Sequence, residues 1–230
     1  MKHLRFYVLA LCLLSGLTSF AQKKNEWNIR VRAIGILPKE SASISVIGGD
    51  VNISNAFVPE LDITYFFAKD FSAELILGTS RHTVKTQGSD LSAIGAGVNA
   101  SVDLGKVWLL PPTLTLQYHL PTATPFKPYV GAGANYTIFY GVNKGSVVQD
   151  ISYKNKFAFA AQAGVDYDIS KNLFLNLDLK KLLLSTKATV NAANLTPAGN
   201  PALAPVLGSI NADVKINPWI VGFGIGYRIR

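Results

Sequence analysis

The sequence predicts an all-β protein, an eight-stranded antiparallel transmembrane β-barrel with short periplasmic turns and long extracellular loops. Three observations lead to this prediction. Apolar side chains alternate with small or polar ones in segments spread over the whole chain. Short and long connections between these segments follow one another in turn. Although 49% of the residues are apolar, no apolar run beyond residue 21 approaches the roughly 18 residues that a membrane-spanning helix needs.

The clearest predicted strand covers residues 128–140. Alternate positions from 130 to 140 read Val, Ala, Ala, Tyr, Ile and Tyr, whereas the positions between them from 131 to 137 read Gly, Gly, Asn and Thr. Because neighbouring side chains of a strand point to opposite faces, one face is apolar and the other is small and polar. A face exposed to water would carry Lys and Glu, so the small residues indicate a crowded interior. Residues 219–229 repeat the pattern, which predicts an apolar face toward lipid in both strands.

The first 21 residues are predicted to be a secretory signal peptide, and residues 22–230 to be the outer-membrane barrel domain. Lys2 and Arg5 precede an apolar run at 6–14, and small residues stand at the cleavage position that ends with Ala21. The apolar run is too short to span a membrane, which argues against a transmembrane anchor.

Cysteine content and charge narrow the possible functions. Cys12 lies in the predicted leader, so the mature chain would contain no disulfide, no thiolate nucleophile and no cysteine-bound metal. Loss of the leader lowers the formal net charge from +8 to +6. The remaining basic residues form no long run, which argues against a nucleic-acid partner.

The expected strands are separated by alternately long and short connections. The strands cover residues 27–36, 60–67, 71–77, 108–120, 128–140, 157–169, 173–180 and 219–229. The long connections cover residues 37–58, 79–106, 141–155 and 187–210. They are interpreted as extracellular loops because they lack sustained alternation. With the short turns on the periplasmic side, this arrangement places both termini in the periplasm.

Charged side chains fall on the inward-facing positions of several predicted strands, so the sequence predicts a charge network in the barrel lumen. The network consists of Arg30, Arg32, Glu60, Asp62, Glu74, Asp166, Asp168, Asp178 and Arg228. In a narrow barrel of low dielectric, such charges are expected to pair with one another. The paired charges could form a plug that fills the lumen, or they could line the polar section of a pore. The limited interior of a small barrel favours the plug.

Pro111 and Pro112 interrupt the beginning of the predicted strand at 108–120. Proline cannot donate a hydrogen bond to a neighbouring strand, so strand pairing is expected to be incomplete at this height. One interpretation is that the strand begins late. The other is a gap in the barrel wall, a lateral opening formed by Leu110, Pro111 and Pro112.

The predicted loop at 195–210 contains many apolar residues for a segment that should face water. The candidates are Leu195, Pro197, Leu203 and Val206. Because exposed apolar patches generally contact something, we expect these four residues to form an extracellular vestibule that gathers hydrophobic solutes.

Residues suited to catalysis, or to binding a metal or cofactor, are scarce. Beyond the leader the chain has only His82 and His119, which are predicted near opposite ends of the barrel. It has no His-x-Ser pair of the kind that lipid A deacylating barrels use. Metal ligation would need a cluster of ligands with suitable spacing. We therefore expect no enzyme, no catalytic residue, no metal and no cofactor.

Four segments carry a resemblance to a known family. They are LPPTLTLQY at 110–118, KPYVGAGANYT at 127–137, QAGVDYDI at 162–169 and NPWIVGFGIGYRI at 217–229. In these segments the chain resembles the outer-membrane protein W (OmpW) family, including its alkane-uptake (AlkL-like) branch. The resemblance implies a narrow outer-membrane channel for small apolar molecules, with lateral exit through the wall. Two departures are the final Ile229-Arg230, where a terminal aromatic residue is typical, and an expanded connection before Trp108.

Two functions follow as hypotheses. The first is a passive outer-membrane channel or facilitator for small hydrophobic molecules, with lateral release into the bilayer. The alternative is a structural or surface-interaction barrel, of receptor or adhesion type, with a plugged lumen. The expected partners are outer-membrane lipid, small apolar solutes and the barrel-assembly machinery during biogenesis.

Overall fold

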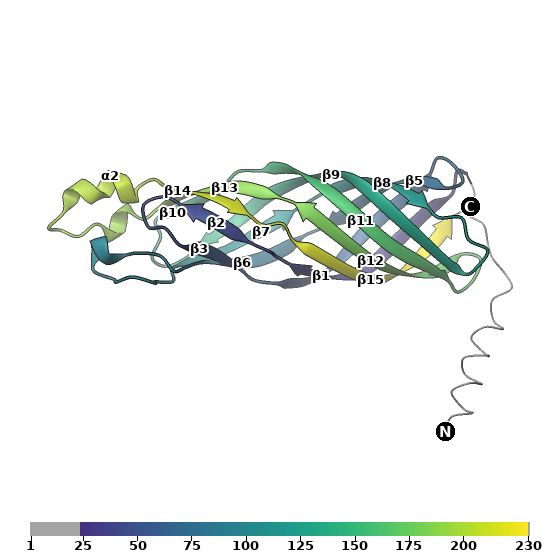
Figure 1. Ribbon diagram of the computed structural model, residues 1–230, viewed down its shortest axis with the longest axis horizontal. Helices are drawn as coiled ribbons and strands as arrows, with labels where there is room; N and C mark the ends of the chain where they lie inside the picture. The colour runs from purple at the N-terminus through teal and green to yellow at the C-terminus, as the bar shows by residue number, and fades with distance from the viewer. Residues whose placement is uncertain (1–23, 230) are drawn as a thin grey trace, which may run out of the picture.

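The alternating segments of the sequence form long antiparallel strands in the computed structural model, which describes residues 24–229. The predicted signal peptide, residues 1–21, lies outside the described residues. The strands form one elongated barrel, with the small helix α2 (Ala204–Leu207) at the end opposite to the start of β1 and the end of β15 (Figure 1). Within residues 24–229, none of the helices has the length and apolar composition required to span a membrane.

The elements of the described chain are as follows. The strands are β1 (Trp27–Leu37), β2 (Ser41–Ile44), β3 (Asp50–Ile53), β4 (Ala56–Phe66), β5 (Phe71–Gly78), β6 (Ser80–Gln87), β7 (Asp103–Leu110), β8 (Thr113–His119), β9 (Phe126–Lys144), β10 (Asp150–Tyr153), β11 (Lys156–Asp168), β12 (Leu173–Leu183), β13 (Ser185–Asn191), β14 (Ile210–Lys215) and β15 (Trp219–Ile229). Three 3-10 turns, η1 (Ser92–Ile94), η2 (Ala193–Leu195) and η3 (Pro201–Leu203), lie in the connections together with α2.

Eight strands of the described chain close into an antiparallel barrel. Their order around the barrel is β1, β4, β5, β8, β9, β11, β12 and β15, and β15 pairs with β1 again. The first and last strands pair over their whole length, from Trp27 opposite Ile229 to Leu37 opposite Trp219. The closed eight-stranded barrel confirms the predicted fold class.

The four long connections are not simple loops, and this part of the prediction is wrong. Strands β6 and β7 extend the barrel along the far end of β9, and β3 pairs with β6. On the other side, β10, β13, β14 and β2 form a four-stranded sheet. These seven strands lengthen the barrel beyond its closed part. Together with the far end of β9, we call them the extension. Prolines and glycines at the junctions make its strands short, so their alternation is hard to recognise in sequence.

The extension keeps the inward and outward phase of the barrel but exchanges the chemistry of the two faces. In β14, Ile210, Ala212 and Val214 are buried, whereas Asp213 and Lys215 are exposed. In the closed part, the side chains that point outward are mostly Leu, Ile, Val and aromatic residues, and most of those that point inward are polar or charged. The outer surface of the extension therefore suits water, and that of the closed part suits lipid.

Exposed aromatic side chains form two belts that bound the apolar outer surface. Near the short turns, the rings of Trp27 and Tyr65 lie 4.5 Å apart. Toward the extension, Trp108 stacks on Tyr140 at 6.2 Å, and Trp219 faces outward at the start of β15. Aromatic belts mark the two interfaces of a membrane barrel. The band between the belts is therefore the membrane-spanning part.

Candidate functional site

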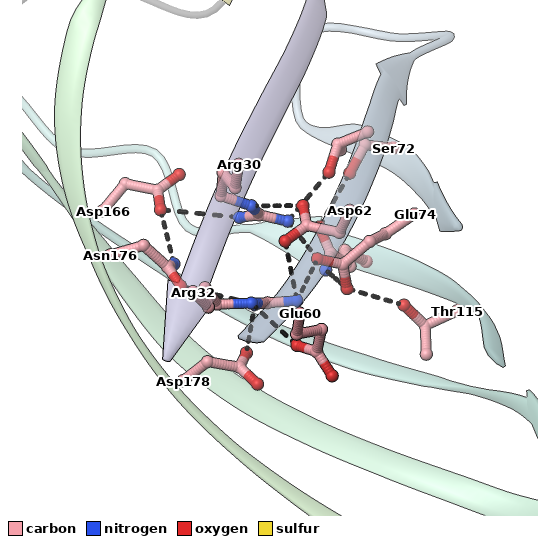
Figure 2. Close-up of polar contacts among 12 residues, drawn as sticks. Arg30, Arg32, Glu60, Asp62, Ser72, Glu74, Thr115, Asp166, Asn176 and Asp178 are labelled. Atoms are coloured by element: carbon pink, nitrogen blue, oxygen red, sulfur yellow. Dashed lines mark hydrogen bonds and ion pairs between the residues drawn. The ribbon is translucent and has the colours of Figure 1, made fainter. Parts of the chain in front are cut away.

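Two arginines lie at the centre of the lumen in the membrane-spanning part, each paired with several carboxylates. Arg30 and Arg32 are two positions apart on β1, so both point inward, and both are fully buried. The Arg30 Nε lies 2.6 Å from Asp62 Oδ1, and its Nη2 also pairs with Glu74. The Arg32 Nη2 lies 2.9 Å from Asp62 Oδ2 and 3.1 Å from Glu74 Oε1. Figure 2 shows the two guanidinium groups stacked one above the other, with carboxylates on either side.

The opposite wall supplies further charges from β11 and β12. Arg30 Nη1 lies 3.6 Å from Asp166, and Arg32 Nη1 lies 3.5 Å from Asp178. Asn176 donates to Asp166 across 2.7 Å and so fixes its orientation. Because each guanidinium pairs with carboxylates from both walls, the ion pairs cross the lumen rather than lining it.

A second group of charges lies nearer the short turns. Arg228 on β15 pairs with Asp168 across 2.6 Å, and its guanidinium lies 4.6 Å from the centre of the Phe174 ring. Its Nε is 3.5 Å from Glu26. The structure thus places all nine residues of the expected charge network in the lumen. Seven of them, including Arg30 and Arg32 themselves, form the central group, and Asp168 and Arg228 belong to the second group.

Several members of the network were not singled out in the sequence. Lys180 pairs with Glu60 across 2.6 Å, and Gln162 donates from Nε2 to both Glu74 and Asp178 across 2.7 Å. The Tyr129 hydroxyl also donates to Asp178 at 2.7 Å. All three side chains stand at inward positions of their strands, but the inward position alone does not reveal which residues they contact.

The inward glycines make room for these long side chains. A Cβ atom at position 164 would lie 2.4 Å from the Tyr129 ring, and one at position 226 would lie 2.2 Å from the Phe174 ring. Side chains of the neighbouring, paired strands therefore occupy the space that the glycines leave. This close approach explains the small inward residues from which the narrow interior was predicted.

Above the charged layer, the extension encloses an apolar cavity of about 110 Å³. Its walls are mainly aliphatic and come from every strand of the extension. Examples are Ile36, Val84, Leu104, Val107, Leu109, Phe139, Leu182, Val190, Ile210 and Ile216. A smaller cavity of about 30 Å³ lies at the junction with the charged layer, where Glu60 and Lys180 form part of its lining. Pro111 lines both cavities.

The barrel wall is unpaired at this junction. The pairing of β5 with β8 ends at Ile76 opposite Thr113, and the pairing of β6 with β7 begins at Ser80 opposite Leu109. In the described chain, no strand pairing joins residues 77–79 to residues 110–112. Leu110, Pro111 and Pro112 therefore stand at an interruption of the ladder, which we call the seam. A side-chain bond crosses its upper edge, because Thr79 Oγ1 donates to the Leu109 carbonyl across 3.0 Å.

Of the four residues predicted to form a vestibule, only some reach the apolar cavity. Leu195 lines the cavity, as does the buried Leu207 of α2. Leu203 packs against the same apolar cluster. Val206 is 42% exposed, and neither it nor Pro197 lines the cavity.

The two histidines lie in different layers. His82 lines the apolar cavity, where its Nδ1 donates to the Ser54 carbonyl across 2.7 Å and its Nε2 lies 3.0 Å from Ser80 Oγ. His119 lies in the polar lumen, 3.0 Å from Ser72 Oγ. The contact between Ser80 and His82 was not predicted from the sequence. Its signal in the sequence is the Ser-x-His spacing, which places both side chains on one face of a strand. Among the described residues, no group of three or more His, Cys, Asp or Glu could hold a metal ion.

A closed antiparallel barrel with an apolar belt and a charged lumen defines the class of outer-membrane β-barrel proteins. Within this class, the chain belongs to the OmpW family, whose sequence model matches residues 23–229. It is 41% identical over 203 residues to the uncharacterized outer-membrane protein y4mB of Sinorhizobium fredii, covering 88% of this chain and 79% of that protein.

Two further comparisons cover most of the chain. The crystal structure of the outer membrane protein OprG from Pseudomonas aeruginosa matches with a TM-score of 0.77 and 25% identity, covering 93% of this chain and all of OprG. The dibenzothiophene metabolism operon protein PahQ of Pseudomonas aeruginosa is 26% identical over 193 residues, covering 82% of this chain and 87% of PahQ.

Proposed function

We propose that the protein is a passive facilitator that admits small hydrophobic molecules into the apolar cavity and releases them through the seam into the bilayer. One observation carries the proposal: the apolar cavity ends on a layer of buried ion pairs, and the wall is unpaired at that same height. A molecule in the cavity therefore lies next to the unpaired wall at residues 110–112, whereas the charge network blocks its way into the lumen.

Passage straight down the lumen is opposed by the charge network. An apolar solute would have to separate Arg30 or Arg32 from carboxylates that are themselves buried. Removing one partner from a buried ion pair costs about 3–5 kcal/mol. Leaving through the wall avoids this cost, because an apolar solute passes from the apolar cavity into the hydrocarbon of the bilayer without separating any ion pair.

The nature of the cargo rests on the cavity lining and on one relative. The lining is mainly aliphatic, and Phe139, Tyr153 and His82 add aromatic rings to it. PahQ is named for a dibenzothiophene metabolism operon. Both observations support a small hydrophobic solute, aliphatic or aromatic.

The proposal includes an orientation in the outer membrane. We assign the short turns and both termini to the periplasm and the extension to the outside, with residues 1–21 removed as a signal peptide. The short turns at one end of the barrel and the long extension at the other support this orientation. Insertion then depends on the barrel-assembly machinery, and the mature domain begins at residue 22.

We also retain the segment at 195–206 as an extracellular vestibule for this cargo. Leu195 and Leu203 would guide solutes toward the cavity, because they continue its apolar surface outward. Deletion of residues 200–206 should reduce uptake of an apolar probe and leave the barrel folded. Unchanged uptake by the deletion variant would contradict this role.

The alternative function is a structural or surface-interaction barrel. The observation that favours it is the lumen itself, which ion pairs cross from wall to wall. Under this alternative the apolar cavity only stabilises the extension, and no solute passes.

Uptake by proteoliposomes separates the two functions. Purified barrel in liposomes is compared with empty liposomes for uptake of a small hydrocarbon probe and of a polar solute of similar size. The facilitator is expected to accelerate uptake of the hydrocarbon only. If the protein accelerates uptake of neither solute, the structural alternative replaces the proposal.

A further inference from the structure

The outer surface of the four-stranded sheet β10–β13–β14–β2 carries a basic groove next to the membrane. Lys156, Lys187 and Lys215 line this groove, which has a volume of about 440 Å³. The remaining polar lining is formed by Ser41, Ser43, Ser185, Thr186 and Asp213. The three lysines come from three different strands, and strand pairing places Ser185 opposite Lys215 and Lys215 opposite Ser41.

The charges of the groove are not balanced by the protein. Lys187 lies 3.2 Å from Asp213, but both side chains are more than half exposed, so this pair is weak. Lys156 and Lys215 form no ion pair with any residue of the described chain. Three ammonium groups thus share one carboxylate, and the groove is suited to an anion with more than one negative charge.

The groove is continuous with the lipid-facing surface below it. Phe157 follows Lys156 directly and is 76% exposed, and Leu183 stands two positions before Ser185 and is 56% exposed. On the same side of the barrel, the Lys181 ammonium lies 4.8 Å from the centre of the Trp219 ring, which belongs to the aromatic belt toward the extension. Basic side chains just beyond an aromatic belt lie at the level of lipid headgroups.

We propose that this groove binds the headgroup of a phosphate-bearing lipid of the outer leaflet. Lys156, Lys187 and Lys215 would contact phosphate oxygens, and the serines would contact headgroup hydroxyls. The acyl chains would lie over Phe157 and Leu183, which no soluble anion would cover. The inference depends on the membrane placement of the barrel and not on the transport of any solute.

Native mass spectrometry of the full barrel tests the proposal. The protein is released from nanodiscs that contain phosphatidylcholine and a small fraction of either lipid A with both phosphates or the same lipid after dephosphorylation. We expect wild type to retain the phosphorylated lipid. The K156Q/K187Q/K215Q variant is expected to retain it at least about tenfold less, since each lysine near an anionic surface contributes to binding.

Two matched variants make the result specific. The variant K85Q/K106Q/K144Q removes the same charge from exposed lysines on β6, β7 and β9, and it should bind like wild type. The variant K156R/K187R/K215R keeps the charge and should also bind like wild type. Equal losses in both glutamine variants, equal retention of the dephosphorylated lipid, or no retained lipid in wild type would each overturn the proposal. Heat-modified migration in gels confirms that each variant is folded.

Discussion

The membrane-spanning barrel and the extension are built from the same strands in the same phase, yet their two faces carry opposite chemistry. From β12 through Leu184 to β13, Asp178 and Leu184 point to the same interior, whereas Leu177 and Lys187 point to the same exterior. Alternation with period 2 therefore specifies a strand in both regions, and residue type specifies the surroundings of each face. Apolar side chains therefore dominate the interior of this barrel only in the extension, where the outer surface faces water.

The two regions should also differ in what stabilises them. The apolar outer face of the membrane-spanning part lies in lipid. The interior of this part can therefore be polar, as long as every charge is paired. The extension stands in water and must bury apolar surface, at about 25 cal/mol per Å². Its interior clusters, which include Leu184, Val190 and Ile216, supply that burial. Four predictions test this difference, from the largest expected effect to the smallest.

Arg30→Ala should give the largest loss of stability. It leaves Asp62 and Glu74 with fewer partners in a lumen from which water is largely excluded, and the expected cost is about 3–5 kcal/mol. Urea unfolding in lipid vesicles, followed by tryptophan fluorescence, measures it. Arg81→Ala, at an exposed position of the extension, is the control and should change stability little. A small effect of Arg30→Ala would mean that the charges do not hold the barrel together.

Leu184→Ala should destabilise the extension by about 2–4 kcal/mol, because Leu184 is fully buried in its apolar cluster. Hydrogen exchange should report faster exchange in β13 and β14, while the amides of β1 and β15 near the short turns remain protected. Leu183→Ala removes an exposed leucine next to it and serves as control. Uniformly faster exchange throughout the barrel would show that the two regions unfold as one unit.

The stability of the extension should depend on pH through His82. The outward residues next to it on β6 are Arg81, Thr83 and Lys85, which suit water and not lipid. His82 therefore lies outside the membrane-spanning part, beyond the aromatic belt toward the extension. Burial lowers the pKa of His82 from its ordinary value of 6.5, and the hydrogen bond to the Ser54 carbonyl only partly opposes this. The unfolded chain therefore binds a proton more readily than the folded chain.

The stabilising contribution is complete above pH 6.5 and is lost as the pH falls toward the pKa of the folded state. His82→Gln should remove this part of the pH dependence. Urea midpoints at pH 5 to 8, measured for wild type and variant, give the difference. Parallel curves for the two proteins would contradict a neutral, buried His82.

Asp213→Asn should have the smallest effect. It removes the partner of Lys187, but exposed ion pairs contribute at most about 1 kcal/mol. Thermal unfolding should therefore be nearly unchanged. A loss as large as that of Leu184→Ala would show that surface charge, and not apolar burial, stabilises the extension.

The closed barrel could be predicted from the sequence because its exterior pattern is strong and long. Residues 219–229 and 128–140 alternate over whole strands, and both predictions hold in β15 and β9. The predicted strand at 108–120 proved to be two, since Pro111 and Pro112 separate β7 from β8. The strands of the extension are not evident in the sequence, because strands such as β2 and β10 have only four residues, too few for a clear alternation.

The candidate site could be predicted only where charge marked it. Inward phase identified the arginines and acids of the lumen, but it could not reveal which strands lie opposite each other across the barrel. The bridging roles of Gln162 and Tyr129 depend on that geometry. The apolar cavity was missed for a related reason: its lining comes from segments that are far apart in sequence and meet only when the extension folds.

The most direct test of lateral release is uptake by a barrel whose seam can pair. Pro111→Ala/Pro112→Ala restores two backbone N–H donors beside residues 77–79, while Pro121→Ala in a short turn is the control. In proteoliposomes, we predict that the double variant takes up a hydrocarbon probe several-fold more slowly than wild type and the control. Equal uptake by all three proteins would contradict release through the seam.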